Sequence, residues 1–424
     1  MFLDSEIKLC VVGLGYVGLP LAIEFGKKFP TIGYDLNSER ISELSYKRDS
    51  TNEISNIEFE EAKFLRFTND LSSIAESNVY IVTVPTPIDE NKEPDLSPLI
   101  SASKAISAFL KEGDVVIYES TVYPGATEEI CLPLLESGSK LRLNIDFYLG
   151  YSPERINPGD RKHKLPNILK VTSGSTPKVA SFIDDLYSKI ITAGTYSAES
   201  IKVAEAAKVI ENTQRDLNIA LINELSVIFN KLNIDTEQVL KAAETKWNFL
   251  PFRPGLVGGH CIGVDPYYLT HKAKSVGYEP KVILSGRKIN DGMARRVAFN
   301  FIEALKEKNI KLNKSKVLIM GICFKENCPD IRNTKVVDLI ECLKENELDV
   351  HIHDPWADKG KLFEEYGYNL IEDFEHDYDG IILAVAHDQY KKMTATEIRN
   401  LGTKNSIIYD LKYILGEHES DLRL

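Results

Sequence analysis

The sequence lacks the features of a membrane, secreted or nucleic-acid-binding protein. It contains no apolar run near the roughly 20 residues that a membrane-spanning helix needs. Its first residues, MFLDSEIKLCVV, lack the basic flank and cleavage site of a signal peptide. Positive charge is not in excess, since 51 Lys and Arg face 63 Asp and Glu and the formal net charge is -12. This balance argues against broad binding to nucleic acid or acidic lipid. We therefore predict a cytoplasmic protein without nucleic-acid or membrane partners.

Cysteine is also scarce, and the six residues are scattered at positions 10, 131, 261, 323, 328 and 342. No cluster of Cys and His completes the spacing of a zinc site. We therefore predict reduced thiols and no bound metal. An anionic ligand would then be held by local devices, such as helix N-termini and single Lys or Arg side chains.

The first 175 residues or so alternate short apolar runs with amphipathic ones. This rhythm predicts a parallel sheet with helices on both faces. The predicted strands are 7–15, 31–36, 78–85, 114–120, 147–152 and 167–174, with helices at 17–28 and 97–111.

The pattern changes between residues 198 and 308. Apolar residues at 203, 207, 210, 217, 221 and 225 have helical spacing and predict a long helix that bridges two domains. Further strands are predicted at 316–324, 349–355, 380–388 and 406–411, with a helix near 335–346. The predicted fold is α/β, with two Rossmann-like doubly wound domains (residues 1–197 and 309–424) joined by a long central helix and a helical middle domain (residues 198–308).

The stretch VVGLGYVGLPLA places Gly13, Gly15 and Gly18 directly after a predicted strand and at the start of a predicted helix. In that context G-x-G-x-x-G is typical of dinucleotide binding. The first glycine permits a tight turn, the second admits the pyrophosphate and the third lets helix and strand pack closely. Asp35 ends the second strand, where a carboxylate binds a ribose 2′-hydroxyl and repels a 2′-phosphate. The pattern predicts NAD as cofactor; glycines that serve packing alone are the alternative.

Cys261 lies in RPGLVGGHCIGVDPYYL, a glycine-rich stretch that predicts neither helix nor strand. A thiolate can add to an aldehyde, and the thiohemiacetal can lose a hydride to give a thioester that water hydrolyses. In a chain with an NAD-binding fold, this cysteine indicates oxidation of an alcohol to an acid. An inert thiol is the alternative that the residues alone leave open.

Seven segments occur in order between residues 11 and 339: VVGLGYVGLPLA, VPTPID, STVYPG, SPER, EAAKVIENT, GGHCIGVDP and GICFKENCPDIRNTKVVDL. Together they resemble the UDP-glucose/GDP-mannose dehydrogenase family over nearly the whole chain. The resemblance implies an NAD-dependent nucleotide-sugar 6-dehydrogenase with Cys261 as nucleophile. It also implies NAD bound by the N-terminal domain, a UDP-sugar bound by the C-terminal domain, and a homodimer or higher homo-oligomer formed through the helical region.

The resemblance further implies catalytic roles for five other residues. Lys208 and Asn212, one helical turn apart, would stabilise oxyanions. Asp265 would help to position a catalytic water, and Thr121 would hold water or the nicotinamide. Glu154 would be the general base for thioester hydrolysis, a role that calls for a pKa raised toward the working pH. Without the resemblance, Lys208 would be a solvated helix lysine, Asp265 a turn residue and Glu154 a surface glutamate.

The resemblance also implies contacts with the two ligands. Those with NAD come from Tyr16, Val17, Arg40, Pro85, Thr86, Thr121 and Arg332. Those with the substrate come from Glu154, Arg155, Lys208, Asn212, Arg253, Gly258 and Lys325.

The sequence departs from one branch of this family at a position that bears on which sugar is oxidised. The glucose-oxidising branch has a second acidic residue four positions after the first, whereas Pro158 stands there in SPERINPGD. The S-P-E-R-x-x-P-G form resembles the branch that oxidises UDP-N-acetylhexosamines for bacterial surface polysaccharides (capsule or O-antigen). UDP-N-acetylglucosamine and UDP-N-acetylgalactosamine both fit. The alternatives are a UDP-glucose or GDP-mannose 6-dehydrogenase, a two-electron NAD dehydrogenase with a structural Cys261, and a non-catalytic sensor of NAD or nucleotide sugar.

Overall fold

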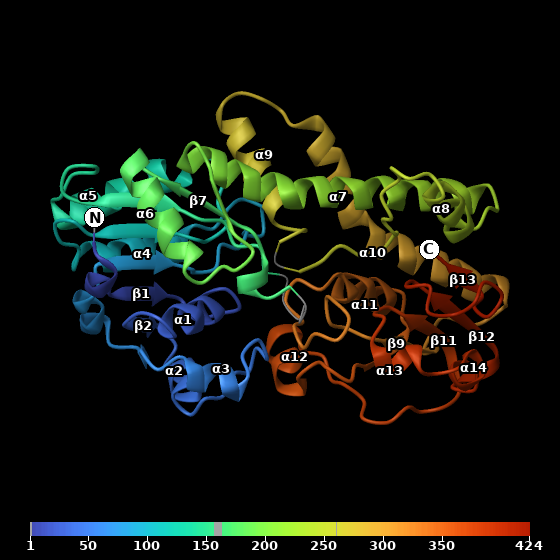
Figure 1. Cartoon of the computed structure of the whole chain (residues 1–424). Helices are drawn as coiled ribbons and strands as arrows, with labels where there is room; N and C mark the ends of the chain where they lie inside the picture. The colour runs from blue at the N-terminus through green and yellow to red at the C-terminus, as the bar shows by residue number, and fades with distance from the viewer. Residues whose placement is uncertain (1, 157–162, 260) are drawn as a thin grey trace. The chain divides into compact units, whose positions relative to one another are not determined.

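The computed structural model describes residues 2–156, 163–259 and 261–424. The chain divides into two compact units (Figure 1). The first comprises Met1–Glu211 and Tyr267–Glu279, and the second Asn212–Pro266 and Pro280–Leu424. Each unit is built on a mainly parallel sheet with helices on its faces, which confirms the predicted α/β class.

The first unit contains an eight-stranded sheet in the order β3-β2-β1-β4-β5-β6-β7-β8. Its strands are β1 Leu9–Val12, β2 Thr31–Tyr34, β3 Leu65–Thr68, β4 Val79–Val82, β5 Val115–Tyr118, β6 Tyr148–Tyr151, β7 Lys170–Gly174 and β8 Thr195–Ser197. The six predicted strands are present, whereas β3 and β8 were not predicted. The expectation of a wholly parallel sheet is wrong at one place, because β6 and β7 run antiparallel.

Helices cover both faces of this sheet, so β1, β2, β4 and β5 are buried at every position. The helices are α1 Gly18–Gly26, α2 Ser38–Ser45, α3 Asn56–Glu61, α4 Ser97–Ser107, α5 Leu132–Ser139 and α6 Pro177–Ser188. Val11 and Ile117 share a core with α1 and α6. On the other face, the Tyr118 hydroxyl lies 2.7 Å from the Ser103 hydroxyl of α4.

The second unit contains a five-stranded parallel sheet in the order β10-β9-β11-β12-β13. Its strands are β9 Lys316–Met320, β10 Asp349–His353, β11 Tyr378–Leu383, β12 Gly402–Asp410 and β13 Leu422–Arg423. Its helices are α8 Thr236–Glu244, α10 Lys281–Glu307, α11 Lys335–Glu345, α12 Lys359–Tyr366, α13 Asp388–Lys391 and α14 Ala395–Arg399.

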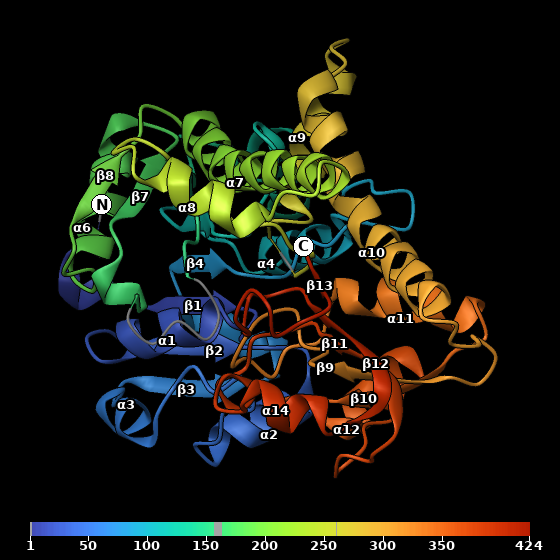
Figure 2. The same cartoon turned by 90° about the vertical axis from the view of Figure 1, so that its right-hand side faces the viewer.

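Alternate residues of β9 serve two separate cores. Val317 and Ile319 pack with residues of α10 and α11, whereas Leu318 and Met320 pack with residues of α13 and α14. This follows from the two-residue period of a strand. Figure 2 shows α11 and α14 on opposite faces of the strands.

The predicted long helix is confirmed as α7, Ile201–Lys231, which runs through the division between the two units. The helix α9, Asp265–Ser275, begins in the second unit and continues in the first. In the first unit, the Tyr268 hydroxyl of α9 donates a hydrogen bond to the Pro87 carbonyl oxygen at 3.1 Å.

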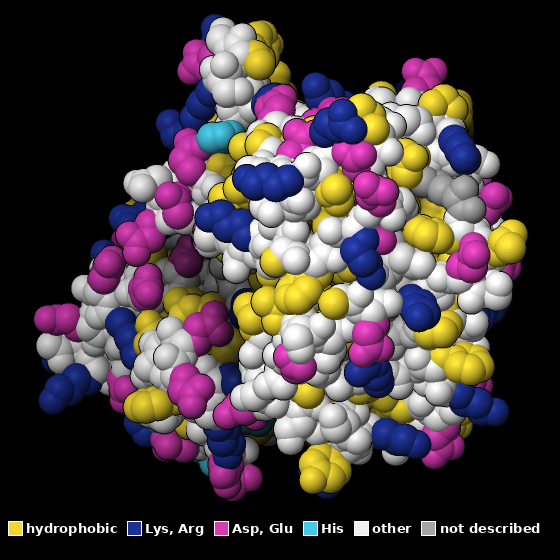
Figure 3. Space-filling model, turned by 90° about the vertical axis from the view of Figure 1, so that its left-hand side faces the viewer, with side chains coloured by type: hydrophobic (Ala, Val, Ile, Leu, Met, Phe, Trp, Pro, Cys, Tyr) yellow, Lys and Arg dark blue, Asp and Glu magenta, His cyan; other side chains and the backbone are white. Residues whose placement is uncertain are grey.

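None of the described helices combines the length and apolar character that a membrane crossing requires. On the face drawn in Figure 3, Lys and Arg side chains are interspersed with Asp and Glu side chains. This distribution agrees with the mixed charge of the sequence.

Candidate functional site

The glycine-rich loop between β1 and α1 uses each of its three glycines differently. Gly13 has a φ of +96°, and a Cβ there would lie 3.1 Å from the Thr83 carbonyl oxygen. A Cβ on Gly18 would lie 1.8 Å from the Gly13 carbonyl oxygen. Gly15 is exposed, and apart from Gly15 and its two chain neighbours no described residue has an atom within 4 Å of the place that its Cβ would take. The loop therefore leaves open space at the N-terminal end of α1, which suits a pyrophosphate.

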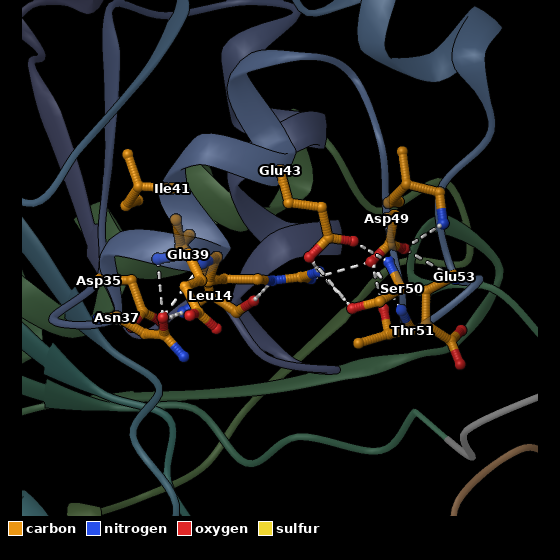
Figure 4. A network of polar contacts seen from close by, with 12 residues as sticks. Leu14, Asp35, Asn37, Glu39, Ile41, Glu43, Asp49, Ser50, Thr51 and Glu53 are labelled. Atoms are coloured by element: carbon orange, nitrogen blue, oxygen red, sulfur yellow. Dashed lines mark hydrogen bonds and ion pairs between the residues drawn. The ribbon is translucent and has the colours of Figure 1, made fainter. Parts of the chain in front are cut away.

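Asp35 and Arg40 hold Leu14 of this loop from two sides. The Asp35 carboxylate accepts a hydrogen bond from the Leu14 N–H at 2.8 Å, and the Arg40 Nε donates to the Leu14 carbonyl oxygen at 3.0 Å. The Arg40 guanidinium is also paired with Asp49 at 2.9 Å and with Glu43 at 3.2 Å. Figure 4 shows how Leu14, Asp35, Glu43 and Asp49 lie. Asp35 follows β2 beside the loop, and the Arg40 charge is already paired with Asp49, so the end of β2 fits the ribose of NAD and disfavours a 2′-phosphate.

Four further residues predicted to bind NAD follow the strands β1 and β4. Tyr16 and Val17 follow β1, and Pro85 and Thr86 follow β4. These two strands are neighbours where the strand order reverses, which is where doubly wound folds bind ligands. Thr83 was missed; its hydroxyl donates to the Gly13 carbonyl oxygen at 2.7 Å and joins the two strand ends.

A buried charge cluster lies where β5 and β6 end. It consists of Glu119, which follows β5, Glu154, which follows β6, and Lys170, the first residue of β7. The Lys170 ammonium group contacts the Glu119 carboxylate and lies 3.3 Å from a Glu154 oxygen. Glu154 is 6% exposed, which excludes the surface-glutamate alternative.

The pKa of Glu154 differs from the expectation. Burial acts to raise it, but the Lys170 charge, a hydrogen bond with Glu119 and further donors outweigh burial, so the pKa lies below its ordinary value. The expected rise toward the working pH is therefore wrong for Glu154. It is found at Glu119 instead, where burial raises the pKa to about 7. Glu119 and Lys170 were not predicted from the sequence, because they are far apart in the chain.

Lys208 lies on α7 and is 7% exposed, so it is not a solvated lysine. Its charge acts on Glu154. One turn earlier, the buried Glu205 carboxylate accepts hydrogen bonds from the N–H groups of Gly125 and Thr127. This contact holds the turn that follows the half-buried Thr121 against α7.

In the second unit, Cys261 lies half-buried in a turn directly before α9. Its carbonyl oxygen accepts a hydrogen bond from the Asp265 N–H at 2.8 Å. A helix N-terminus favours a negative charge such as a thiolate. The two preceding glycines cannot be replaced by larger residues without strain. A Cβ on Gly258 would lie 2.5 Å from the Asn333 carbonyl oxygen. Gly259 has a φ of +82°, and its N–H donates a hydrogen bond to the same oxygen at 3.1 Å.

The structure brings Asn212 and Asp265 together, since the Asn212 amide donates to the Asp265 carboxylate. Asp265 is 1% exposed and is therefore not an ordinary turn residue. Asn223, further along α7, was missed. Its buried amide binds both backbone groups of Gly255, with the Gly255 N–H at 2.8 Å and the carbonyl oxygen at 3.1 Å. It thereby anchors the start of the segment that carries Cys261.

A hollow opens at the carboxyl ends of β9 and β11, where the order of the second sheet reverses. Lys325, Lys335 and Lys412 line it, together with Phe324 and Gly258. The Lys335 ammonium group is paired with Asp338 at 2.7 Å, and the positive charges of Lys325 and Lys412 suit an anionic ligand such as a diphosphate. Of these lysines, Lys325 was predicted to bind the substrate, whereas Lys335 and Lys412 were not predicted.

Three predicted arginines are engaged in ion pairs. Arg155 pairs with Glu211 of α7, Arg253 with Glu237 and Glu244 of α8, and Arg332 with Asp330. Their contacts with ligands stay predictions. Pro158 lies outside the described residues.

Cys323, Asp354 and His387 are buried, with potential metal-ligand atoms within 4.8 Å of one another. The His387 Nδ1 accepts a hydrogen bond from the Asn327 N–H at 2.9 Å, so the ring proton lies on Nε2, 3.1 Å from Asp354. The same Asp354 oxygen accepts the Cys323 N–H at 3.0 Å. Both ring nitrogens are thus used within the protein, which indicates a structural role.

The chain matches three domains of one family. Residues 7–191 match the NAD binding domain of the UDP-glucose/GDP-mannose dehydrogenase family, residues 202–292 its central domain and residues 318–417 its UDP binding domain.

Individual proteins give the same result. A UDP-N-acetyl-D-glucosamine 6-dehydrogenase of Pseudomonas aeruginosa is 61% identical over 99% of this chain and 100% of its own length. One of Salmonella typhi is 56% identical over 100% of both chains. The structure of a UDP-D-ManNAc dehydrogenase from Pyrococcus horikoshii has a TM-score of 0.87 at 29% identity, covering 97% of this chain and 96% of that one. The chain therefore belongs to the UDP-glucose/GDP-mannose dehydrogenase family and is an NAD-dependent dehydrogenase.

Proposed function

We propose that the protein oxidises C6 of a UDP-N-acetylhexosamine to the uronic acid in two successive two-electron steps. The observation that carries the proposal is the turn of Cys261, which glycines hold in place beside the bonded pair of Asn212 and Asp265. The relatives of 61% and 56% identity are UDP-N-acetyl-D-glucosamine 6-dehydrogenases, which favours UDP-N-acetylglucosamine over UDP-N-acetylgalactosamine. Uronic acids of this kind would serve the synthesis of surface polysaccharide.

NAD would be held by the glycine loop, Asp35 and the residues that follow β4, and it supplies the hydride acceptor for both oxidations. The chain supplies the remaining chemistry. The Cys261 thiolate adds to the C6 aldehyde and forms a C–S bond, and Lys208 and Asn212 stabilise the resulting oxyanion. After the second hydride has left, Glu154 takes a proton from the water that attacks the thioester, and Asp265 helps to position that water. The C–S bond then breaks and Cys261 leaves as a thiolate.

We further propose three functional regions with the predicted boundaries. Residues 1–197 would bind NAD, residues 198–308 would carry the catalytic Lys and Cys and form a homodimer, and residues 309–424 would bind the UDP group. Exposed apolar side chains in the middle region support self-association. Trp247 is 92% exposed, and Leu221 and Ile228 of α7 are also exposed.

The first experiment counts NADH formed per nucleotide sugar consumed, with excess NAD and limiting sugar. We expect two NADH from UDP-N-acetylglucosamine, and less turnover with UDP-N-acetylgalactosamine, UDP-glucose and GDP-mannose as comparison substrates. One NADH per sugar would leave a two-electron dehydrogenase with a structural Cys261. No NADH from any of the four would indicate a sensor.

Gly258→Ala should displace the turn of Cys261, because its Cβ would lie 2.5 Å from a backbone oxygen. We expect kcat/KM to fall about 100-fold, the size of loss that a 1 Å misplacement can cause. Gly263→Ala is the matched control, since its Cβ would have its closest neighbour at 3.6 Å, an ordinary contact. Steady-state NADH formation measures both variants. Equal activities would show that the tight glycine contact does not position Cys261.

A further inference from the structure

The cluster of Glu119, Lys170 and Glu154 contains two carboxyl groups and one ammonium group, all withdrawn from water. Glu119 is 1% exposed and Lys170 is 2% exposed. The Lys170 ammonium group donates to one Glu119 oxygen, to a Glu154 oxygen at 3.3 Å and to the Pro153 carbonyl oxygen at 3.1 Å. One lysine therefore serves two acids.

The two acids have different surroundings. One Glu154 oxygen accepts the N–H groups of Arg155, at 2.6 Å, and Ile156. Lys208 of α7 adds a second positive charge near Glu154. Glu119 receives, besides Lys170, the hydroxyl of Tyr187 on α6 at 2.5 Å. Backbone N–H groups and an additional cation thus favour the charge on Glu154.

Two buried carboxyl groups that share one cation do not both ionise easily, because like charges repel strongly where water is excluded. Glu119 also forms a side-chain hydrogen bond with Glu154. The proton that such a pair retains belongs on the acid with fewer donors. This is Glu119, whose pKa burial raises to about 7, while that of Glu154 is lowered.

We propose that Lys170 and Glu119 are positioning residues for Glu154, with Lys170 fixing the Glu154 carboxylate and Glu119 carrying the proton that the pair retains. The inference rests on the proposed function, in which Glu154 is the base of thioester hydrolysis. In that step the water oxygen bonds to the thioester carbon, a water proton moves to Glu154, and the C–S bond breaks with Cys261 leaving as a thiolate. The cluster keeps Glu154 able to accept that proton.

Lys170→Met tests the first part. Without the ammonium group the pKa of Glu154 rises, so less carboxylate is present at a given pH. The acidic limb of the kcat profile should move upward by about one to three pH units, the usual effect of losing an opposite charge. Activity at pH 7 should fall at least about tenfold, recover as the pH is raised, and be accompanied by a covalent Cys261 thioester visible in the intact protein mass. Lys170→Arg keeps the charge and should retain the wild-type profile.

Glu119→Gln tests the second part. The amide is isosteric with a protonated carboxyl group and can still donate to Glu154, so activity at pH 6 should stay within about threefold of wild type. Any inflection near pH 7 in the dependence of kcat on pH should disappear, because the carboxyl group that ionises there has been removed. The double variant Lys170→Met with Glu119→Gln should match Lys170→Met alone at pH 7, because Glu119 is already protonated there and the amide replaces one neutral donor by another.

Wild-type protein in the same series separates this inference from the proposed function. If wild type does not form two NADH per sugar, the proposed function fails and the inference with it. If wild type forms two, the inference is overturned by an undisplaced acidic limb in Lys170→Met, by a double variant clearly more or less active at pH 7 than Lys170→Met, or by Lys170→Arg as impaired as Lys170→Met. Circular dichroism verifies that each variant is folded, and Glu119→Gln is decisive by itself if Lys170→Met does not fold.

Discussion

Cys261→Ser is expected to stop net turnover of the nucleotide sugar. A serine hydroxyl is not ionised near neutral pH and is a far weaker nucleophile than a thiolate, so the aldehyde is not captured. We expect the steady-state rate of NADH formation to fall about a thousandfold or more, the scale of loss when a covalent nucleophile is removed. Stopped-flow absorbance should show at most one NADH per active site.

The matched control is Cys342→Ser. Cys261 and Cys342 are both half-buried, whereas the other four cysteines are buried. Cys342 lies on α11, outside the glycine-rich segment, and its replacement should leave the rate within about twofold of wild type, as for most surface changes. Full turnover by Cys261→Ser would instead support the two-electron alternative. Binding of NAD to Cys261→Ser, followed by fluorescence, should be unchanged, since Cys261 is not among the residues predicted to bind NAD and all of these except Arg332 lie in the first unit.

Arg287→Met should cause a large loss of unfolding free energy in the second unit. Arg287 of α10 is 2% exposed and pairs with the buried Asp216 of α7 at 2.6 Å. Removing one partner leaves the other charge buried without its ion pair, which costs about 3–5 kcal/mol of unfolding free energy. Urea unfolding followed by circular dichroism measures the change. Lys288→Met, at the exposed neighbouring position of the same helix, should cost less than about 0.5 kcal/mol.

The loss should depend on pH in a defined direction. Burial already raises the pKa of Asp216, although Arg287 acts against it. Without Arg287 the pKa rises further, so the folded variant binds a proton that the unfolded chain has released. Stability then falls as the pH rises from the ordinary range of an aspartate through the raised pKa. The difference from wild type should be largest at neutral pH, and a loss independent of pH would show that Asp216 does not determine it.

Local signals in the sequence were sufficient for much of the fold. The cofactor loop was predicted because strand, glycines, helix and Asp35 follow one another within one βαβ unit, so neighbouring residues carry the whole pattern. The long helix α7 was predicted because its apolar residues keep helical spacing over many turns. The short edge strands β3 and β8 were missed, since three or four residues with mixed burial give no clear period.

The parts that could not be predicted depend on contacts between distant segments. Glu119 and Lys170 are 51 residues apart, and although each lies in a predicted strand, nothing in the sequence shows that the two side chains meet. The same holds for Asp354 and His387, which are 33 residues apart. The direction of the pKa shift at Glu154 could not be predicted either. Lys170 and the backbone donors that lower this pKa become neighbours of Glu154 only when the chain folds.

The hydrogen bonds that Asp35 and Arg40 form with Leu14 affect the entropy of cofactor binding. The N–H and carbonyl groups of Leu14 are both bonded to side chains, and one of these, Arg40, is itself fixed by Asp49 and Glu43. The rotamers of these side chains and the dihedral angles of the loop are thus restricted when the protein folds. Their conformational entropy is lost at that stage, so it does not oppose the later association with a dinucleotide.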